Sequence, residues 1–135
     1  MANKKTNVLD ALVVALGNLS EVSTATRILA TPATARKKSP YVGLIAGAEE
    51  PIVEDDTDVR FVLDVDIILL KNGRDIEKML DVVKDLLYSD ALAATIEAFQ
   101  IRKIGQEEVA LLDADKYSST RIIVTITYVA TKGAF

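Results

Sequence analysis

The stretch that most constrains the fold of this chain is RFVLDVDIILLKNG, which runs from Arg60 to Gly73. Apolar residues occupy every second position over ten residues, as in a β-strand with one buried face. Asp64 and Asp66 are two residues apart, so both carboxylates lie on the opposite face. The sequence therefore predicts a long strand with a pair of parallel carboxylates in its middle. The buried set is Phe61, Leu63, Val65, Ile67 and Leu69.

The segment TRIIVTITYVA, near the end of the chain, predicts a second long strand. Ile122, Val124, Ile126 and Tyr128 would share its buried face. The other face would carry Arg121, Thr125 and Thr127.

Two helices are predicted from apolar residues at helical spacing. NVLDALVVALGNL predicts a short amphipathic helix, with Asn7 as its N-cap and Gly17 at its end. RDIEKMLDVVKDLLYS has the stronger pattern, with Asp75 as a candidate cap. A further helical turn is expected in SDALAATIEAF.

The remaining segments have weaker patterns. EVSTATRIL is rich in β-branched residues and predicts a strand. We expect a long irregular loop at about 31–51, because three prolines interrupt it, although YVGLIAG inside it could form a short strand. FQIRKIGQEEVALL predicts a weaker strand that is broken near Gly105.

Together these elements predict an α/β (α+β) fold. We expect a mixed, mostly antiparallel sheet of about four strands, with two main helices packed on one face. A length of 135 residues indicates a single domain, 1–135, with a core of ordinary size. Two helices cover one face only, so the face with Asp64 and Asp66 would meet water or another subunit.

The composition argues against several classes of function. The chain has no Cys and no His, which removes disulfides, thiol nucleophiles, Ser-His-Asp triads and ordinary zinc sites. The net charge is −4, made of +4 in residues 1–48 and −8 in residues 49–135. An acidic chain does not suit general DNA coating. We find no signal-peptide pattern and no apolar run of membrane-spanning length, so we expect a protein kept in a cytoplasm, with no membrane partner.

Asp64 and Asp66 admit three interpretations. A pair of carboxylates could hold Mg²⁺, but the sequence has no glycine-rich phosphate loop to accompany such a site. An acid/base pair would need desolvation, which no pattern here signals. The third interpretation is a row of carboxylates that faces solvent or pairs across strands with Arg121 or Arg27 opposite, and the pattern favours it. We therefore expect no enzyme activity, no catalytic or metal site and no cofactor.

A basic cluster, Arg36, Lys37 and Lys38, lies in the predicted loop, followed by Tyr41. A short basic cluster in a loop is most often solvated. Its alternative use is a contact with a neighbouring subunit, ring or nucleic acid, and the four residues are candidates for such a contact. With one aromatic residue nearby, stacking on single-stranded nucleic acid is not expected.

The order of elements resembles a known family. An opening helix and a strand are followed by PYVGLIAGAEEP, the long strand RFVLDVDIIL, the helix DIEKMLDVVKDLL and the closing strand RIIVTITYV. This arrangement resembles the tail terminator proteins of long-tailed bacteriophages, the lambda-type neck proteins. The similarity covers nearly the whole chain, but it is one of element order and contains no short diagnostic motif.

The resemblance implies a structural virion protein of the tail and neck. Such a protein forms a hexameric ring that caps the tail tube, stops its polymerisation and joins the head-completion (stopper) proteins. DNA passes through the channel without sequence-specific binding. The face with Asp64, Asp66, Arg121, Thr125 and Thr127 would then line the channel or meet a neighbouring subunit, and an acidic channel would let DNA slide. The alternatives are another head–tail joining protein, a tail-tube subunit, or a small non-viral α/β protein-binding module.

Overall fold

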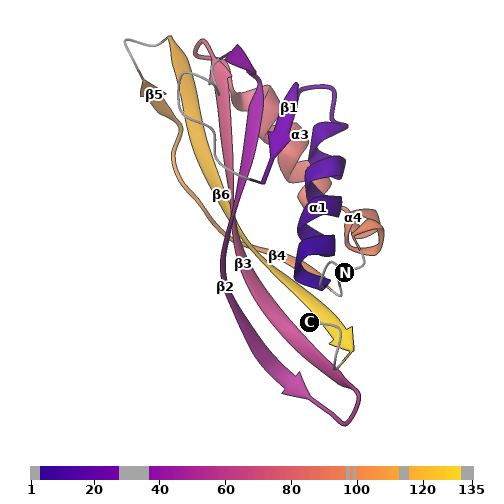
Figure 1. Cartoon of the computed structure of the whole chain (residues 1–135). Coiled ribbons are helices and arrows are strands. Elements are labelled where there is room, and N and C mark those ends of the chain that lie inside the picture. Colours follow the sequence, from indigo (N-terminus) through magenta and orange to yellow (C-terminus); the bar gives the residue numbers. More distant parts are fainter. Residues whose placement is uncertain (1–3, 28–36, 97, 99, 113–115, 132–135) are drawn as a thin grey trace.

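The computed structural model describes residues 4–27, 37–96, 98, 100–112 and 116–131. These residues form a mixed α and β fold in which three helices lie on one side of a long, twisted sheet (Figure 1). The helices are α1 (Lys4–Gly17), α3 (Glu77–Leu87) and the short α4 (Asp90–Thr95). The strands are β1 (Thr24–Thr26), β2 (Tyr41–Glu54), β3 (Asp58–Asn72), β4 (Gln100–Gln106), β5 (Ala110–Leu112) and β6 (Tyr117–Thr131).

The described strands form one six-stranded sheet in the order β1-β2-β3-β6-β4, and β5 pairs with the beginning of β6. The β1–β2 pair is parallel and the other pairs are antiparallel. The mixed, mostly antiparallel sheet is thus confirmed, but the expected number of about four strands is wrong. The predicted weak strand FQIRKIGQEEVALL is divided into β4 and β5, and β4 is irregular between Lys103 and Gly105, where its break was predicted.

We expected a loop at about 31–51. From Tyr41 onward this is wrong, because strand β2 begins at Tyr41 and continues through Pro51 to Glu54. Residues 28–36 lie outside the described residues. The register of β2 against β3 shifts between Ala46 and Glu49 and again between Pro51 and Val53. The possible short strand YVGLIAG is thus the first half of β2, and the irregularities and the proline hid its second half from period-based prediction.

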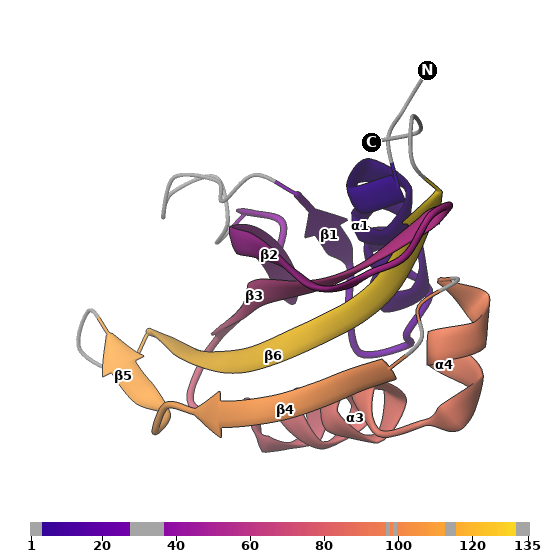
Figure 2. The same ribbon diagram turned by 90° about the horizontal axis from the view of Figure 1, so that it is seen from below.

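The two long strands bury the faces that their alternation predicted. One contiguous core joins odd-numbered residues of β3, even-numbered residues of β6 and apolar residues of all three helices. Ile67 and Val124 are fully buried in it. Helix α1 packs beside β1 and β2, whereas α3 lies along β4 (Figure 2). The prediction of two main helices on one face is therefore confirmed.

The helix boundaries differ from those expected. Helix α1 begins at Lys4, so Asn7 lies inside its first turns and is not an N-cap. Helix α3 begins at Glu77 with Ile76 at the N-cap position, so Asp75 precedes the cap. None of the described helices is long and apolar enough to cross a membrane.

Strands β2 and β3 continue past the helices as a projecting hairpin (Figure 1). Asp55 closes its tip, because one carboxylate oxygen accepts hydrogen bonds from the backbone N–H groups of Thr57 and Asp58 at 2.9 and 2.6 Å. Every residue of β2 from Gly47 to Glu54 is exposed. We call residues 47–58 the arm.

Candidate functional site

The face of the sheet opposite the helices brings together the predicted polar residues. Asp64 pairs in register with Thr125, and Asp66 lies one pair further along, opposite Ile123. Thr127 pairs with Val62 on the same face. We call this surface the open face.

On the open face, Arg121 of β6 connects to β3 and to the residue that follows β4. Its Nη1 donates a hydrogen bond to Oδ2 of Asp66 at 3.2 Å, and its Nη2 pairs with the carboxylate of Glu107. The guanidinium therefore lies between two carboxylates, one on β3 and one just after β4. Of the two arginines expected opposite Asp66, Arg121 is the one found, whereas Arg27 pairs with Asp10 of α1 at 3.2 Å.

Glu107, the second carboxylate that pairs with Arg121, was not predicted from the sequence. Its backbone is fixed to β6, because its N–H donates to the carbonyl of Arg121 at 2.9 Å and its carbonyl accepts from the Thr120 hydroxyl at 2.7 Å. It follows the ambiguous segment FQIRKIGQ, so no periodic signal could place it on this face.

Asp64 is exposed and lies beside an irregularity of β2. The backbone of Gly47 approaches so closely that a Cβ there would meet the Asp64 Cβ and carbonyl oxygen, both at 3.3 Å. Gly47 thus lets the arm pass next to the carboxylate.

Asp64 and Asp66 belong to no group of three or more carboxylates arranged to hold a metal ion, as judged over the described residues.

The charges of the open face are mixed. Register places Arg60 opposite Val129 and Arg102 opposite Thr125, so both arginines share this face with Asp64 and Asp66. The open face therefore carries more positive charge than the predicted Arg121 alone supplies. Arg60 has the parity of Asp64 and Asp66 on β3, whereas the position of Arg102 depends on the register of β4 against β6.

Apolar side chains also reach the open face. They lie among the charged residues. Their side chains are half-buried or exposed, whereas those of the core are buried. The five are Ile45, Val62, Ile68, Ile123 and Val129. Interspersed branched apolar and charged side chains are typical of a surface that contacts protein.

The candidate loop residues do not form one site. Lys37 and Lys38 are exposed, Arg36 lies outside the described residues, and Tyr41 is fully buried at the start of β2. The Tyr41 hydroxyl hydrogen-bonds with the Thr26 hydroxyl at 2.5 Å, and the ring packs with Leu70. The interpretation of Tyr41 as a contact residue for a partner is therefore wrong.

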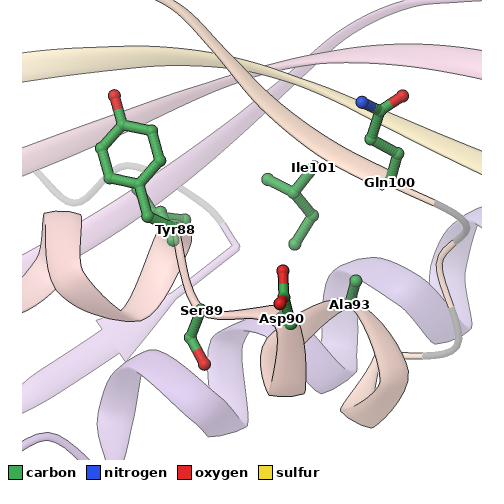
Figure 3. A pocket seen from close by; sticks show the side chains of 7 residues that line it. Tyr88, Ser89, Asp90, Ala93, Gln100 and Ile101 are labelled. Atoms are coloured by element: carbon green, nitrogen blue, oxygen red, sulfur yellow. The ribbon is translucent and has the colours of Figure 1, made fainter.

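A shallow cavity of about 390 Å³ lies between the α3–α4 junction and β4. Asp90 and Ile101 point toward each other across it, while the Tyr88 ring extends away (Figure 3). The cavity holds one carboxylate and mostly small or apolar side chains. This lining does not assemble the acid, base and nucleophile that a catalytic centre combines.

Comparisons with known proteins give only a weak structural likeness. No protein-family model and no curated protein sequence matches the chain. Among solved structures it is similar to a chain of "Virion of native gene transfer agent (GTA) particle", with a TM-score of 0.48 and 11% identity over 96% of this chain and 92% of that chain. A likeness at this level carries no functional assignment.

Proposed function

We propose that this chain is a structural virion protein, a tail terminator that forms a hexameric ring at the neck of a phage-like particle. The ring would cap the tail tube, stop its polymerisation and offer its other surface to the head-completion protein. It would be assembled in the host cytoplasm, and DNA would pass through its centre. The role is non-catalytic and uses no cofactor.

The observation that carries the proposal is the long sheet with one face free of helices. Strands β3 and β6 pair over fifteen residues, yet the described helices cover only one of the two faces. The open face bears Ile123 and Ile68 beside Asp66 and Arg121, a mixture suited to contact with protein. A ring subunit has a use for such a face, because it must meet neighbours in addition to water.

The ion-pair geometry supports a structural use of Asp66. Arg121 reaches both Asp66 and Glu107, so the carboxylate of Asp66 already has a cationic partner from a neighbouring strand. Cross-strand ion pairs of this kind contribute to sheet pairing. We propose that Asp64, Asp66, Thr125 and Thr127 face a neighbouring subunit, and the mixed charges favour this arrangement over a bare acidic channel lining.

Assembly of tail tubes tests the proposal. Tube subunits from the same particle are polymerised with and without this protein, and the products are imaged by electron microscopy. We expect capped tubes of limited length when the protein is present from the start. Tubes that elongate equally in both reactions, with no density added at their ends, would contradict a terminator.

A further inference from the structure

The two ends of the sheet carry opposite charge. The arm at one end contains six carboxylates and no Lys or Arg. Five of the six residues are exposed, and Asp58 is half-buried. The acidic residues of the arm are Glu49, Glu50, Glu54, Asp55, Asp56 and Asp58.

Basic residues gather at the other end, where β2 begins, β3 ends and β6 begins. The register brings these three termini together, because Tyr41 pairs with Leu70 and Asn72 pairs with Tyr117. The Asn72 N–H donates to the Ser39 hydroxyl at 2.8 Å, and the Gly73 N–H donates to the Lys116 carbonyl at 2.7 Å. We call this group the basic end; its members are Lys37, Lys38, Lys71, Arg74 and Lys116.

The basic end contains few carboxylates among the described residues. Asp75 follows Arg74 directly, and the group with Asp75 included stays positive. Asp113 and Asp115, between β5 and β6, lie outside the described residues. Strand β3 runs for fifteen residues from Asp58, at the tip of the arm, to Asn72 beside the basic end, which is about 45 to 50 Å at the usual rise per residue.

Each end also exposes a pair of large apolar side chains. On the arm, Ile52 and Val53 are 52% and 53% exposed. At the basic end, Leu111 and Leu112 of β5 are 44% and 37% exposed. Val53 pairs with Arg60 and Leu112 pairs with Tyr117, so these two side chains lie on the open face, whereas Leu111 lies on the opposite face. Figure 1 shows β5 and the tip of the arm at opposite ends of the sheet.

An apolar centre with a charged rim is the usual composition of a protein interface, and complementary rims fix its partner and its register. The arm does not suit strand addition, because Pro51 and two register shifts interrupt the edge of β2. Its side chains, not its backbone, are therefore what it offers to a partner.

We propose that the arm of one copy docks on the basic end of a second copy, with Val53 against Leu112 inside a rim of opposite charges. Both surfaces belong to the same chain, so a second copy is the occupant that the charges and apolar pairs match. The contact joins two different surfaces, so it repeats from copy to copy and closes into a ring where the rotation permits. The inference rests on the proposed function in one respect, since it adds the arm and the basic end to the open face as surfaces that join ring neighbours.

Charge reversal and mixing test the contact. The arm-reversed variant is Glu49→Lys/Glu50→Lys, and the end-reversed variant is Lys37→Glu/Lys38→Glu. The first variant lowers the net charge of the arm from −6 to −2, and the second lowers that of the five basic residues from +5 to +1. Each should therefore self-associate at least about tenfold more weakly than the natural protein. Mixed in equal amounts, the two variants should associate again, because the end-reversed variant keeps the natural arm and the arm-reversed variant keeps the natural basic end.

The measurement is sedimentation velocity at equal protein concentration, in about 0.05 M and about 0.5 M salt, where the higher salt should weaken association. The control is Asp81→Lys/Asp85→Lys, which makes the same charge change on exposed positions of α3 and should associate like the natural protein. Circular dichroism confirms that each variant is folded.

The outcomes separate this contact from the proposed function. Any one of three results would overturn the contact: the natural protein stays monomeric, the variants associate normally, or their mixture stays dissociated. Tube capping by such proteins would still leave the terminator role in place. Conversely, restoration on mixing without any tube capping would support the contact and contradict the terminator.

Discussion

Arg121 Nη1 lies 3.2 Å from Asp66 Oδ2 while Nη2 of the same guanidinium pairs with Glu107. One side chain thus joins β3, β6 and the residue after β4 on the open face. This arrangement explains why the mid-strand carboxylate is tolerated: it has a cationic partner that register holds in place.

The ion pair gives a first prediction. Arg121→Met should lower the free energy of unfolding by about 0.5 to 1 kcal/mol, since the partners are only partly buried. Urea unfolding measures it, and a double-mutant cycle with Asp66→Asn isolates the coupling. Arg27→Met, at the more exposed pair with Asp10, is the control and should cost less. Equal losses at both arginines would contradict a special role for Arg121.

The two faces of β3 give a second prediction. Ile67 is fully buried under the helices, whereas its neighbour Ile68 is half-buried on the open face. Ile67→Ala should cost about 2 to 4 kcal/mol of unfolding free energy, and Ile68→Ala under about 1 kcal/mol in the monomer. Urea unfolding of the two variants, identical in chemistry, compares the faces directly. A larger loss at Ile68 would mean that the open face is covered in the monomer.

Gly73 gives a third prediction, because it has a φ of +88°, a backbone conformation that side chains disfavour. Its carbonyl accepts a hydrogen bond from the Ser118 hydroxyl at 2.9 Å, which fixes the connection from β3. Gly73→Ala should destabilise the fold by about 1 kcal/mol. Gly17→Ala, at the end of α1, is the control: its Cβ would meet only an ordinary 3.7 Å contact. Thermal unfolding that ranked the two variants in the opposite order would contradict this account.

The open face gives a fourth prediction. Ile123→Asp should leave the monomer folded and abolish assembly into rings, because it puts an unpaired charge into the proposed subunit contact. Val14→Asp, on an exposed position of α1, should leave assembly unchanged. Light scattering reports assembly, and circular dichroism reports folding. Normal rings from Ile123→Asp would remove the open face from the contact.

Replacing both Asp64 and Asp66 with Lys addresses the arrangement of the same face in the particle. We expect impaired assembly or impaired DNA release, since the exchange reverses charges next to Arg121. Infectivity or DNA transfer by particles carrying the variant measures the effect. A fully active double variant would contradict any role of this face in the ring.

The sequence predicted the elements whose residues alternate or repeat regularly. β3, β6 and the apolar stripe of α3 are buried as their periods required, because burial of one face is what selects such patterns. The sequence did not predict the second half of β2, where Pro51, adjacent glutamates and two register shifts remove the alternation of apolar and polar residues. That strand exists through its long pairing with β3, a tertiary effect that a local pattern does not report.

The candidate site was predicted in part for a similar reason. Asp64, Asp66, Arg121 and the two threonines lie on strands with a clear period, so their common face followed from parity. The parity of β3 also places Arg60 on this face, whereas Arg102 and Glu107 join it only through the pairing with β6, and β4 has an irregular register. Tyr41 was misplaced because the loop interpretation left its side chain without the strand that buries it.

The most direct test of the central claim is negative-stain electron microscopy of the purified protein at high concentration. The account predicts discrete sixfold rings with an open centre that do not stack into tubes. Two results would contradict the account. In one, the protein stays as single subunits at every concentration and forms no ring on the ends of tail tubes; in the other, it polymerises into tubes of unlimited length.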